Sequence, residues 1–287
     1  MTPEWFRWAL EQRPQHLEIE VEGAPIHYRA WGDPGDPVAV LVHGGAAHSG
    51  WWDHVGPHLA VGHRVLAPDL SGHGDSGRRD AYSLEGWARE ILAVAQAEHG
   101  DKPVVFGHSM GGFVALTAAR EHGHDLLGAA AIDSPVQAVS PEAREWRKDR
   151  ADLTMPVYPD AATMVSRFRT LPEDDSSLPY VREHIARGSI RRVDGPNGSG
   201  WSWKFDPRVF LRSSMTPDDV TRAACEVALL RGERGMATTD ITEEIRSRLG
   251  GAVPVTVIPD SGHHIMLDQP TALIAVLQTL LGQWRKR

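Results

Sequence analysis

The segment PVVFGHSMGGFVALTAAR, residues 103–120, is the most informative part of the chain for its fold. PVVF is a short apolar run of the kind that forms strands buried on both faces of a parallel sheet, and FVALTAAR is typical of a helix. Between them, GHSMGG matches G-x-S-x-G, in which Gly107 and Gly111 permit a sharp turn and leave the Ser109 hydroxyl exposed. The helix N-terminus behind the serine favours developing negative charge. The stretch therefore predicts a nucleophilic serine, Ser109, at a strand-to-helix turn.

Similar apolar runs alternate along the chain with stretches that are compatible with helices. The expected strands are residues 17–21, 25–31, 38–42, 64–67, 103–106, 127–132, 227–230 and 253–258. The expected helices are residues 84–98, 110–121, 240–249 and 271–284. This alternation favours an α/β protein with a mostly parallel sheet that is flanked by helices on both faces.

The alternation breaks between Ser134 and Ala224, a stretch without a clear buried strand. Ser140 and Pro141 are typical of a helix N-cap and first helical position. We interpret the stretch as an inserted, mainly helical cap over the carboxyl edge of the sheet. The predicted division is a core formed by residues 1–133 and 225–287, with the cap at 134–224.

The composition excludes several classes of function. The chain of 287 residues has 30 basic and 38 acidic residues, and its net charge of −8 gives no global attraction to nucleic acid or anionic lipid. No stretch approaches the roughly 20 apolar residues of a membrane span. The N-terminal segment is too polar for a signal peptide, and the lone Cys225 cannot form an internal disulfide. We expect a cytoplasmic protein that acts on a small molecule, and the oligomeric state stays open.

Four motifs together resemble the α/β-hydrolase fold superfamily, in particular serine hydrolases with a cap domain. Besides GHSMGG, they are LVHGGAAHSGWW at 41–52, PDLSGHGDSG at 68–77 and SGHHIMLDQP at 261–270. The likeness covers nearly all of the chain outside the inserted stretch. It implies an α/β-hydrolase fold and a serine nucleophile, with no cofactor and no metal. His54 and His58 have a metal-compatible spacing, but no HExxH motif accompanies them, and we expect a structural role.

The resemblance implies that His263, directly after Gly262 in the last motif, is the general base. Serine is a poor nucleophile at neutral pH, so an imidazole must take its proton. His264 is the neighbouring alternative. Asp268 is expected to be the N-cap of the last helix.

The acid that orients this histidine has two candidate locations. Most of the family carries it in G-x-x-D after the late strand, but here that segment reads RGERG and Gly235 stands at the position of the acid. A minority takes it from the end of the preceding strand, where AAAIDSP places Asp133. We therefore favour Asp133, with Glu233 and Asp240 as alternatives. All three satisfy the chain order Ser, acid, His.

The developing oxyanion needs two backbone N–H groups. Met110, which follows the nucleophile, supplies one, and the family analogy assigns the other to Gly45. Candidate residues of a substrate pocket are His43, Gly44, Trp51, Trp201 and Trp203.

The resemblance therefore implies an enzyme that hydrolyses a carboxylic ester or lactone through an acyl-enzyme. Two alternatives use the same fold: a hydrolase of carbon–carbon bonds in vinylogous diketones, and a ligand receptor with slow turnover. The fold does not separate them, because function resides in the pocket.

Overall fold

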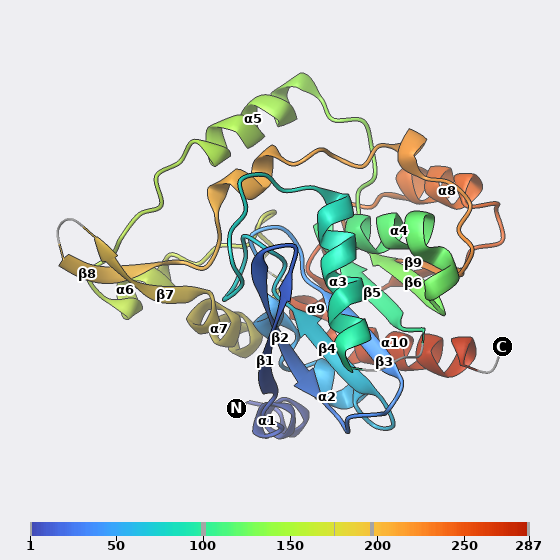
Figure 1. Ribbon diagram of the computed structural model, residues 1–287, viewed down its shortest axis with the longest axis horizontal. Coiled ribbons are helices and arrows are strands. Elements are labelled where there is room, and N and C mark those ends of the chain that lie inside the picture. The colour runs from blue at the N-terminus through green and yellow to red at the C-terminus, as the bar shows by residue number, and fades with distance from the viewer. Residues whose placement is uncertain (1, 99–101, 175, 196–197, 286–287) are drawn as a thin grey trace.

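Eight strands form one mixed sheet in the order β1-β2-β4-β3-β5-β6-β9-β10 (Figure 1). The computed structural model describes residues 2–98, 102–174, 176–195 and 198–285. The strands are β1 (Gln15–Val21), β2 (Ala24–Trp31), β3 (Val38–Val42), β4 (Arg64–Pro68), β5 (Val104–His108), β6 (Gly128–Ile132), β9 (Glu226–Gly232) and β10 (Val255–Ile258). β2 pairs antiparallel with β1 and β4, and the other neighbours are parallel. The mostly parallel sheet is confirmed, and the ends of every expected strand lie within two residues of the observed ones.

Helices cover both faces of this sheet because successive side chains of a strand point to opposite sides. In β3, Val38, Val40 and Val42 belong to the apolar cluster on the side of α3 (Leu84–Glu98), α4 (Met110–His122) and α8 (Thr239–Arg248). Ala39 and Leu41 belong to the cluster on the other side, with α1 (Glu4–Glu11), α2 (Gly56–Leu59), α9 (Ile265–Asp268) and α10 (Pro270–Trp284). None of the helices in the described ranges has the length and apolar character needed to cross a bilayer.

Residues 134–224, here called the inserted segment, leave the core after β6 and return at β9 (Figure 1). The segment contains α5 (Pro141–Ala151), α6 (Ala161–Ser166), α7 (Pro179–Gly188), a hairpin of β7 (Ile190–Gly195) and β8 (Gly198–Trp203), and the 3₁₀ turns η3 (Pro207–Leu211) and η4 (Pro217–Asp219). Two further 3₁₀ turns, η1 (Ser49–Trp52) and η2 (Gly123–Asp125), belong to the core. The Ser140 hydroxyl accepts the Ala143 N–H at 3.2 Å, which confirms the predicted cap of α5.

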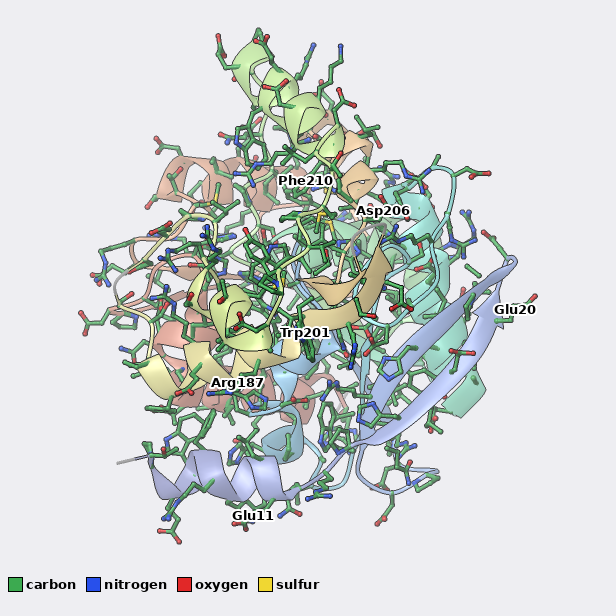
Figure 2. The ribbon with its side chains drawn as sticks, turned by 90° about the vertical axis from the view of Figure 1, so that its left-hand side faces the viewer. Glu11, Glu20, Arg187, Trp201, Asp206 and Phe210 are labelled. Atoms are coloured by element: carbon green, nitrogen blue, oxygen red, sulfur yellow. The ribbon has the colours of Figure 1, made fainter. Side chains whose placement is uncertain are left out.

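The inserted segment is mainly helical, as expected, and the antiparallel hairpin β7–β8 adds two strands that the sequence did not indicate. Its strands lie at the surface, where Arg192 and Asp194 are exposed, so they lack the apolar run that identifies a buried strand. Trp201 lies on β8, whereas Phe210 lies on η3, farther from α1 (Figure 2).

Candidate active site

Ser109 occupies the turn between β5 and α4 in a strained backbone conformation, with φ 55° and ψ −116°. Residues other than glycine rarely adopt a positive φ, and such a conformation costs about 1–3 kcal/mol. The strain persists because the turn is tightly enclosed: a Cβ at Gly107 would lie 2.0 Å from the Gly111 carbonyl oxygen, and one at Gly111 2.4 Å from that of Val42. Only glycine fits at either position. The half-buried Ser109 side chain therefore faces the carboxyl edge of the sheet.

The structure brings Ser109, His263 and Asp133 together in one hydrogen-bonded chain. The Ser109 Oγ lies 3.0 Å from His263 Nε2, and His263 Nδ1 lies 2.6 Å from Asp133 Oδ2. His263 follows β10, and its carbonyl oxygen accepts a hydrogen bond of 2.8 Å from the ring of His108 at the end of β5. Three elements that are distant in sequence thus converge on one edge of the sheet.

Asp133 directly follows β6 and is fully buried. Besides the contact with His263, its carboxylate accepts the Gly232 N–H at 3.1 Å and the Met236 N–H at 2.8 Å. A Cβ at Gly235 would lie 1.9 Å from Asp133 Oδ1. The carboxylate therefore fills the space that a side chain at position 235 would need, which explains the glycine at the position where most of the family has its acid.

The alternative acids lie elsewhere. Glu233 is exposed, and its carboxylate accepts the Asp260 N–H at 3.0 Å. Asp240 is exposed in the first turn of α8. Of the three candidates, only Asp133 contacts His263.

The His264 ring packs beside that of His263, with 4.7 Å between the ring centroids. Its ring lies 5.5 Å from that of Trp51, and burial, with the neighbouring His263, lowers the pKa of His264 to about 3. The ring therefore stays neutral and packs with its aromatic neighbours. No hydrogen bond joins His264 to Ser109 or Asp133 within the described residues, whereas His263 contacts both.

Asp268 does not cap the last helix, contrary to expectation. The short helix α9 ends at Asp268, and Gln269 takes the position before α10. The Asp268 carboxylate instead accepts the Gly262 N–H at 2.8 Å and the Ser177 hydroxyl at 3.2 Å. It therefore ties the loop that carries His263 to the inserted segment.

Gly45 and Met110 line the same pocket as Ser109 and His263. Because Met110 is the first residue of α4, its N–H has no acceptor within the helix. Gly44 lies directly against the serine, since a Cβ there would be 3.4 Å from Ser109 Cβ. Both predicted oxyanion donors thus border the space in front of the serine.

His43 orders this loop and does not line the pocket. Its Nε2 accepts the Leu70 N–H at 3.1 Å, and its Nδ1 donates to the Gly44 carbonyl at 2.7 Å. Burial lowers the pKa of His43, which keeps the ring neutral and leaves Nε2 free to accept. Asp69 supports the loop from the other side by accepting the Ser49 N–H at 2.6 Å.

The pocket beside Ser109 has a volume of about 520 Å³ and lies between the core and the inserted segment. Its wall includes Met110 and Phe113 from the core and Val139, Trp146, Arg147, Leu171, Phe210, Arg212 and Met215 from the insertion. Sequence reasoning missed these insertion residues, and nothing in their pattern indicates the pocket. Phe113 could have been found, because it lies one helical turn after Ser109.

The three tryptophans expected in this pocket lie elsewhere, and the structure corrects that expectation. Trp51 and Trp203 each lie with their ring 6.3 Å from the ring of Phe168. Trp201 lines a separate groove beside α6 and α7. Trp51 is buried, whereas Trp201 and Trp203 are half-buried on β8.

Two clusters in the described ranges place potential metal ligands within 4.8 Å of one another: His108, His263 and His264, and the trio His27, Asp69 and Asp75. In the first cluster, His263 uses both ring nitrogens for its contacts with Ser109 and Asp133. In the second, the His27 ring is hydrogen-bonded to Asp69 at 2.8 Å. Of the two histidines whose spacing suggested a metal, His54 contacts the Met266 carbonyl at 2.7 Å, and the ring of His58 lies 4.7 Å from that of Trp8.

Comparisons with known proteins agree with the fold. The model of the alpha/beta hydrolase family matches residues 39–276. The esterase Rv0045c of Mycobacterium tuberculosis is 28% identical over 275 residues, which cover 92% of this chain and 89% of the esterase. A solved structure of that esterase covers 98% of this chain and 100% of its own, with a TM-score of 0.76 at 23% identity.

Two other relatives differ in kind. The lipase LipV of the same bacterium is 26% identical over 90% of this chain and 98% of its own. The karrikin insensitive 2 receptor IA of Petunia hybrida is 26% identical over 85% of this chain and 89% of its own. The relatives thus include both hydrolytic enzymes and a receptor.

Proposed function

The chain belongs to the alpha/beta hydrolase family, and from this premise we propose that it is a serine hydrolase that cleaves a carboxylic ester or lactone of a small molecule through an acyl-enzyme. The observation that carries the proposal is the hydrogen-bonded chain from Ser109 through His263 to Asp133. Esterase and lipase relatives along most of the chain support ester hydrolysis.

In the first step, Ser109 Oγ attacks the carbonyl carbon of the ester while His263 Nε2, 3.0 Å away, accepts the hydroxyl proton. Asp133 keeps the remaining proton of His263 on Nδ1 and stabilises the imidazolium. The tetrahedral intermediate then collapses: the bond to the leaving group breaks, and His263 gives its proton to the departing alcohol. The acyl group stays on Ser109.

The negative charge on the tetrahedral oxygen is stabilised by the N–H groups of Gly45 and Met110. The N-terminus of α4 directs its positive dipole end at the same point. In serine hydrolysis, loss of one such donor costs about 2.7–4 kcal/mol of transition-state stabilisation. The Gly44 contact with the serine and the hydrogen bonds of His43 hold the loop in place.

Deacylation repeats these steps with water as the nucleophile. His263 takes a proton from water, the hydroxide attacks the acyl carbon, and the serine leaves with the returned proton. The residues therefore supply every proton transfer without a cofactor or metal. In this proposal the inserted segment acts as the cap over Ser109, because its residues form much of the pocket wall.

The test compares hydrolysis of a chromogenic ester, p-nitrophenyl hexanoate, by the wild type and by Ser109→Ala. We expect turnover to disappear in the variant while the melting temperature changes little, because alanine keeps the Cβ and the substitution removes only a half-buried hydroxyl. Retained turnover in Ser109→Ala would contradict a mechanism through an acyl-enzyme on Ser109.

A slow-turnover receptor is the second candidate, favoured by the likeness to the karrikin receptor of Petunia hybrida. The two candidates differ in sustained product release. An enzyme continues at a constant rate after the first turnover, whereas a receptor releases about one equivalent of product per protein and then slows. Stopped-flow followed by steady-state measurement with the same ester separates them.

A further inference from the structure

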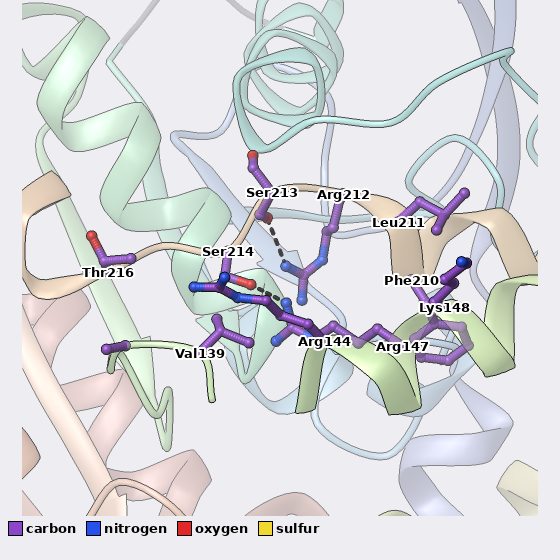
Figure 3. A pocket seen from close by; sticks show the side chains of 11 residues that line it. Val139, Arg144, Arg147, Lys148, Phe210, Leu211, Arg212, Ser213, Ser214 and Thr216 are labelled. Carbon is purple, nitrogen blue, oxygen red and sulfur yellow. Dashed lines mark hydrogen bonds between the residues drawn. The ribbon is translucent and has the colours of Figure 1, made fainter. Parts of the chain in front are cut away.

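Two arginine side chains line the pocket that contains Ser109. Arg147 comes from α5, and Arg212 follows η3. Both also line an adjoining depression of about 380 Å³, where the arginines of α5 and Arg212 gather around Ser213 and Ser214 (Figure 3). The reactive serine and a pair of cations therefore share one continuous wall.

These cations have no carboxylate partner within the described residues. Three enclosed arginines of the core are each paired with a carboxylate: Arg29 with Asp53, Arg64 with Glu98 and Arg79 with Glu90, at 2.7–2.9 Å. By contrast, Arg212 donates to the Ser213 carbonyl at 3.0 Å, and Arg147 donates to the Ser214 hydroxyl. A guanidinium has five N–H donors, so most donors of both side chains are available to a ligand.

The placement of this pair is electrostatically unfavourable in the free protein. Burial, and then the neighbouring Arg147, lower the pKa of Arg212 to about 9, and burial lowers the pKa of Arg147. Both effects disfavour positive charge, yet an arginine stays protonated at neutral pH. The ring of Phe113 lies 5.7 Å from the Arg212 guanidinium carbon, and the planar edge of the cation keeps the N–H donors that the Ser213 carbonyl does not use. An anion at that edge would offset both the burial and the repulsion.

We propose that Arg147 and Arg212 form a subsite for an oxyanion of the substrate, so that the ester cleaved at Ser109 carries a carboxylate or phosphate at a distance from its reacting carbonyl. The planar guanidinium matches both groups through two parallel hydrogen bonds. Apolar side chains such as Phe113 and Met215 line the same pocket and would contact the connecting chain. This inference names the substrate class and rests on the proposed ester hydrolysis.

The test uses two substrates with the same six-carbon acyl chain and the same leaving group. p-Nitrophenyl hexanoate ends in a methyl group, whereas mono-p-nitrophenyl adipate ends in a carboxylate. The readout is the ratio of their kcat/KM values, adipate over hexanoate. We expect Arg212→Gln to lower this ratio about 10- to 100-fold, because it removes charged hydrogen bonds to the carboxylate only. Arg147→Gln should act in the same direction.

Arg7→Gln is the matched control. It removes the same charge from α1, an element at the opposite end of the molecule from Phe210 and η3 (Figure 2), and should leave the ratio and both rates unchanged. Hexanoyl coenzyme A, whose phosphates lie on the leaving group, tests whether the arginines bind a phosphate instead of an acyl-chain carboxylate. A fall in its kcat/KM relative to hexanoate in Arg212→Gln, with the adipate ratio constant, would identify the oxyanion as a phosphate.

An unchanged ratio for both anionic substrates in Arg212→Gln and Arg147→Gln, with the neutral ester still hydrolysed, would overturn the inference and leave the hydrolase proposal intact. Failure of the wild type to hydrolyse any of the three substrates, together with an unreactive Ser109, would instead contradict the hydrolase proposal. Thermal melting of each variant verifies folding, and Arg147→Gln, on a surface helix, provides the test if Arg212→Gln does not fold.

Discussion

Replacing Asp133 by asparagine tests whether this carboxylate orients His263. Three N–H donors converge on it: Gly232 on Oδ1 at 3.1 Å, and Met236 and the His263 ring on Oδ2 at 2.8 and 2.6 Å. Asparagine has the same shape but offers one accepting oxygen and one donating NH₂ group. In either orientation of the amide, the NH₂ group faces a backbone N–H that the carboxylate accepted.

The orientation decides which function is lost. With the NH₂ group in the place of Oδ2, it donates to His263 Nδ1, so the ring proton moves to Nε2 and that nitrogen cannot accept the Ser109 proton. With the oxygen in that place, the ring keeps its tautomer but loses the negative charge that stabilises the imidazolium. We expect kcat to fall about 10⁴-fold, as it does when the orienting acid of serine proteases is changed in this way. This is about 5 kcal/mol of activation free energy.

The assay is steady-state hydrolysis of p-nitrophenyl hexanoate, with thermal unfolding as a measure of folding. Because an unpaired buried donor remains, the free energy of unfolding should fall by about 1–3 kcal/mol. Glu233→Gln and Asp240→Asn are the matched controls and should retain wild-type kcat, since both side chains are exposed and neither is hydrogen-bonded to His263. A loss in kcat smaller than about tenfold for Asp133→Asn, or a large loss for Glu233→Gln, would refute the assignment.

Three other predictions concern neighbouring residues. His263→Ala should abolish turnover of the same ester, whereas His264→Ala should lower the melting temperature with a much smaller loss of kcat; the reverse order would move the base by one residue. Gly235→Ala should lower kcat, with a change in KM that is no larger, because the new Cβ would lie 1.9 Å from Asp133 Oδ1 and force the carboxylate to move. Unchanged kinetics would contradict the described packing. Although burial opposes it, the hydrogen bond to the His27 ring, together with the neighbouring His48 and His43, holds the pKa of Asp69 well below its usual range. Its contribution to stability is therefore present above about pH 4 and lost as the pH falls further, so the wild type should lose more stability than Asp69→Asn between pH 5 and pH 3, measured by urea unfolding.

The core could be predicted because its signals are local. The apolar runs of β3, β5 and β6 are buried on both faces, and such runs are visible in sequence without knowledge of tertiary contacts. The positions of Ser109 and His263 followed from motifs on either side of these strands. Asp133 was harder to choose, because the usual position of the acid in this family is occupied by Gly235. Only the structure shows that the Asp133 carboxylate fills the space beside this glycine.

The pocket could not be predicted, because its wall comes from an inserted segment with no periodic apolar pattern. Trp201 and Trp203 were conspicuous in sequence but lie on β8, away from Ser109. Arg212 was inconspicuous, and its position near the serine depends on how η3 returns across the carboxyl edge of the sheet. Similarly, the sequence predicted that Asp268 caps the last helix, but Asp268 ends the short helix α9 and its carboxylate accepts the Gly262 N–H.

The most direct test of the central claim is the intact mass of the protein after exposure to a fluorophosphonate. These reagents phosphonylate serines that a neighbouring base has activated, with loss of fluoride. The contacts of Ser109 with His263 predict a single adduct on the wild type and none on Ser109→Ala. An unmodified wild type, or an adduct that persists in Ser109→Ala, would contradict the assignment of Ser109 as the activated nucleophile.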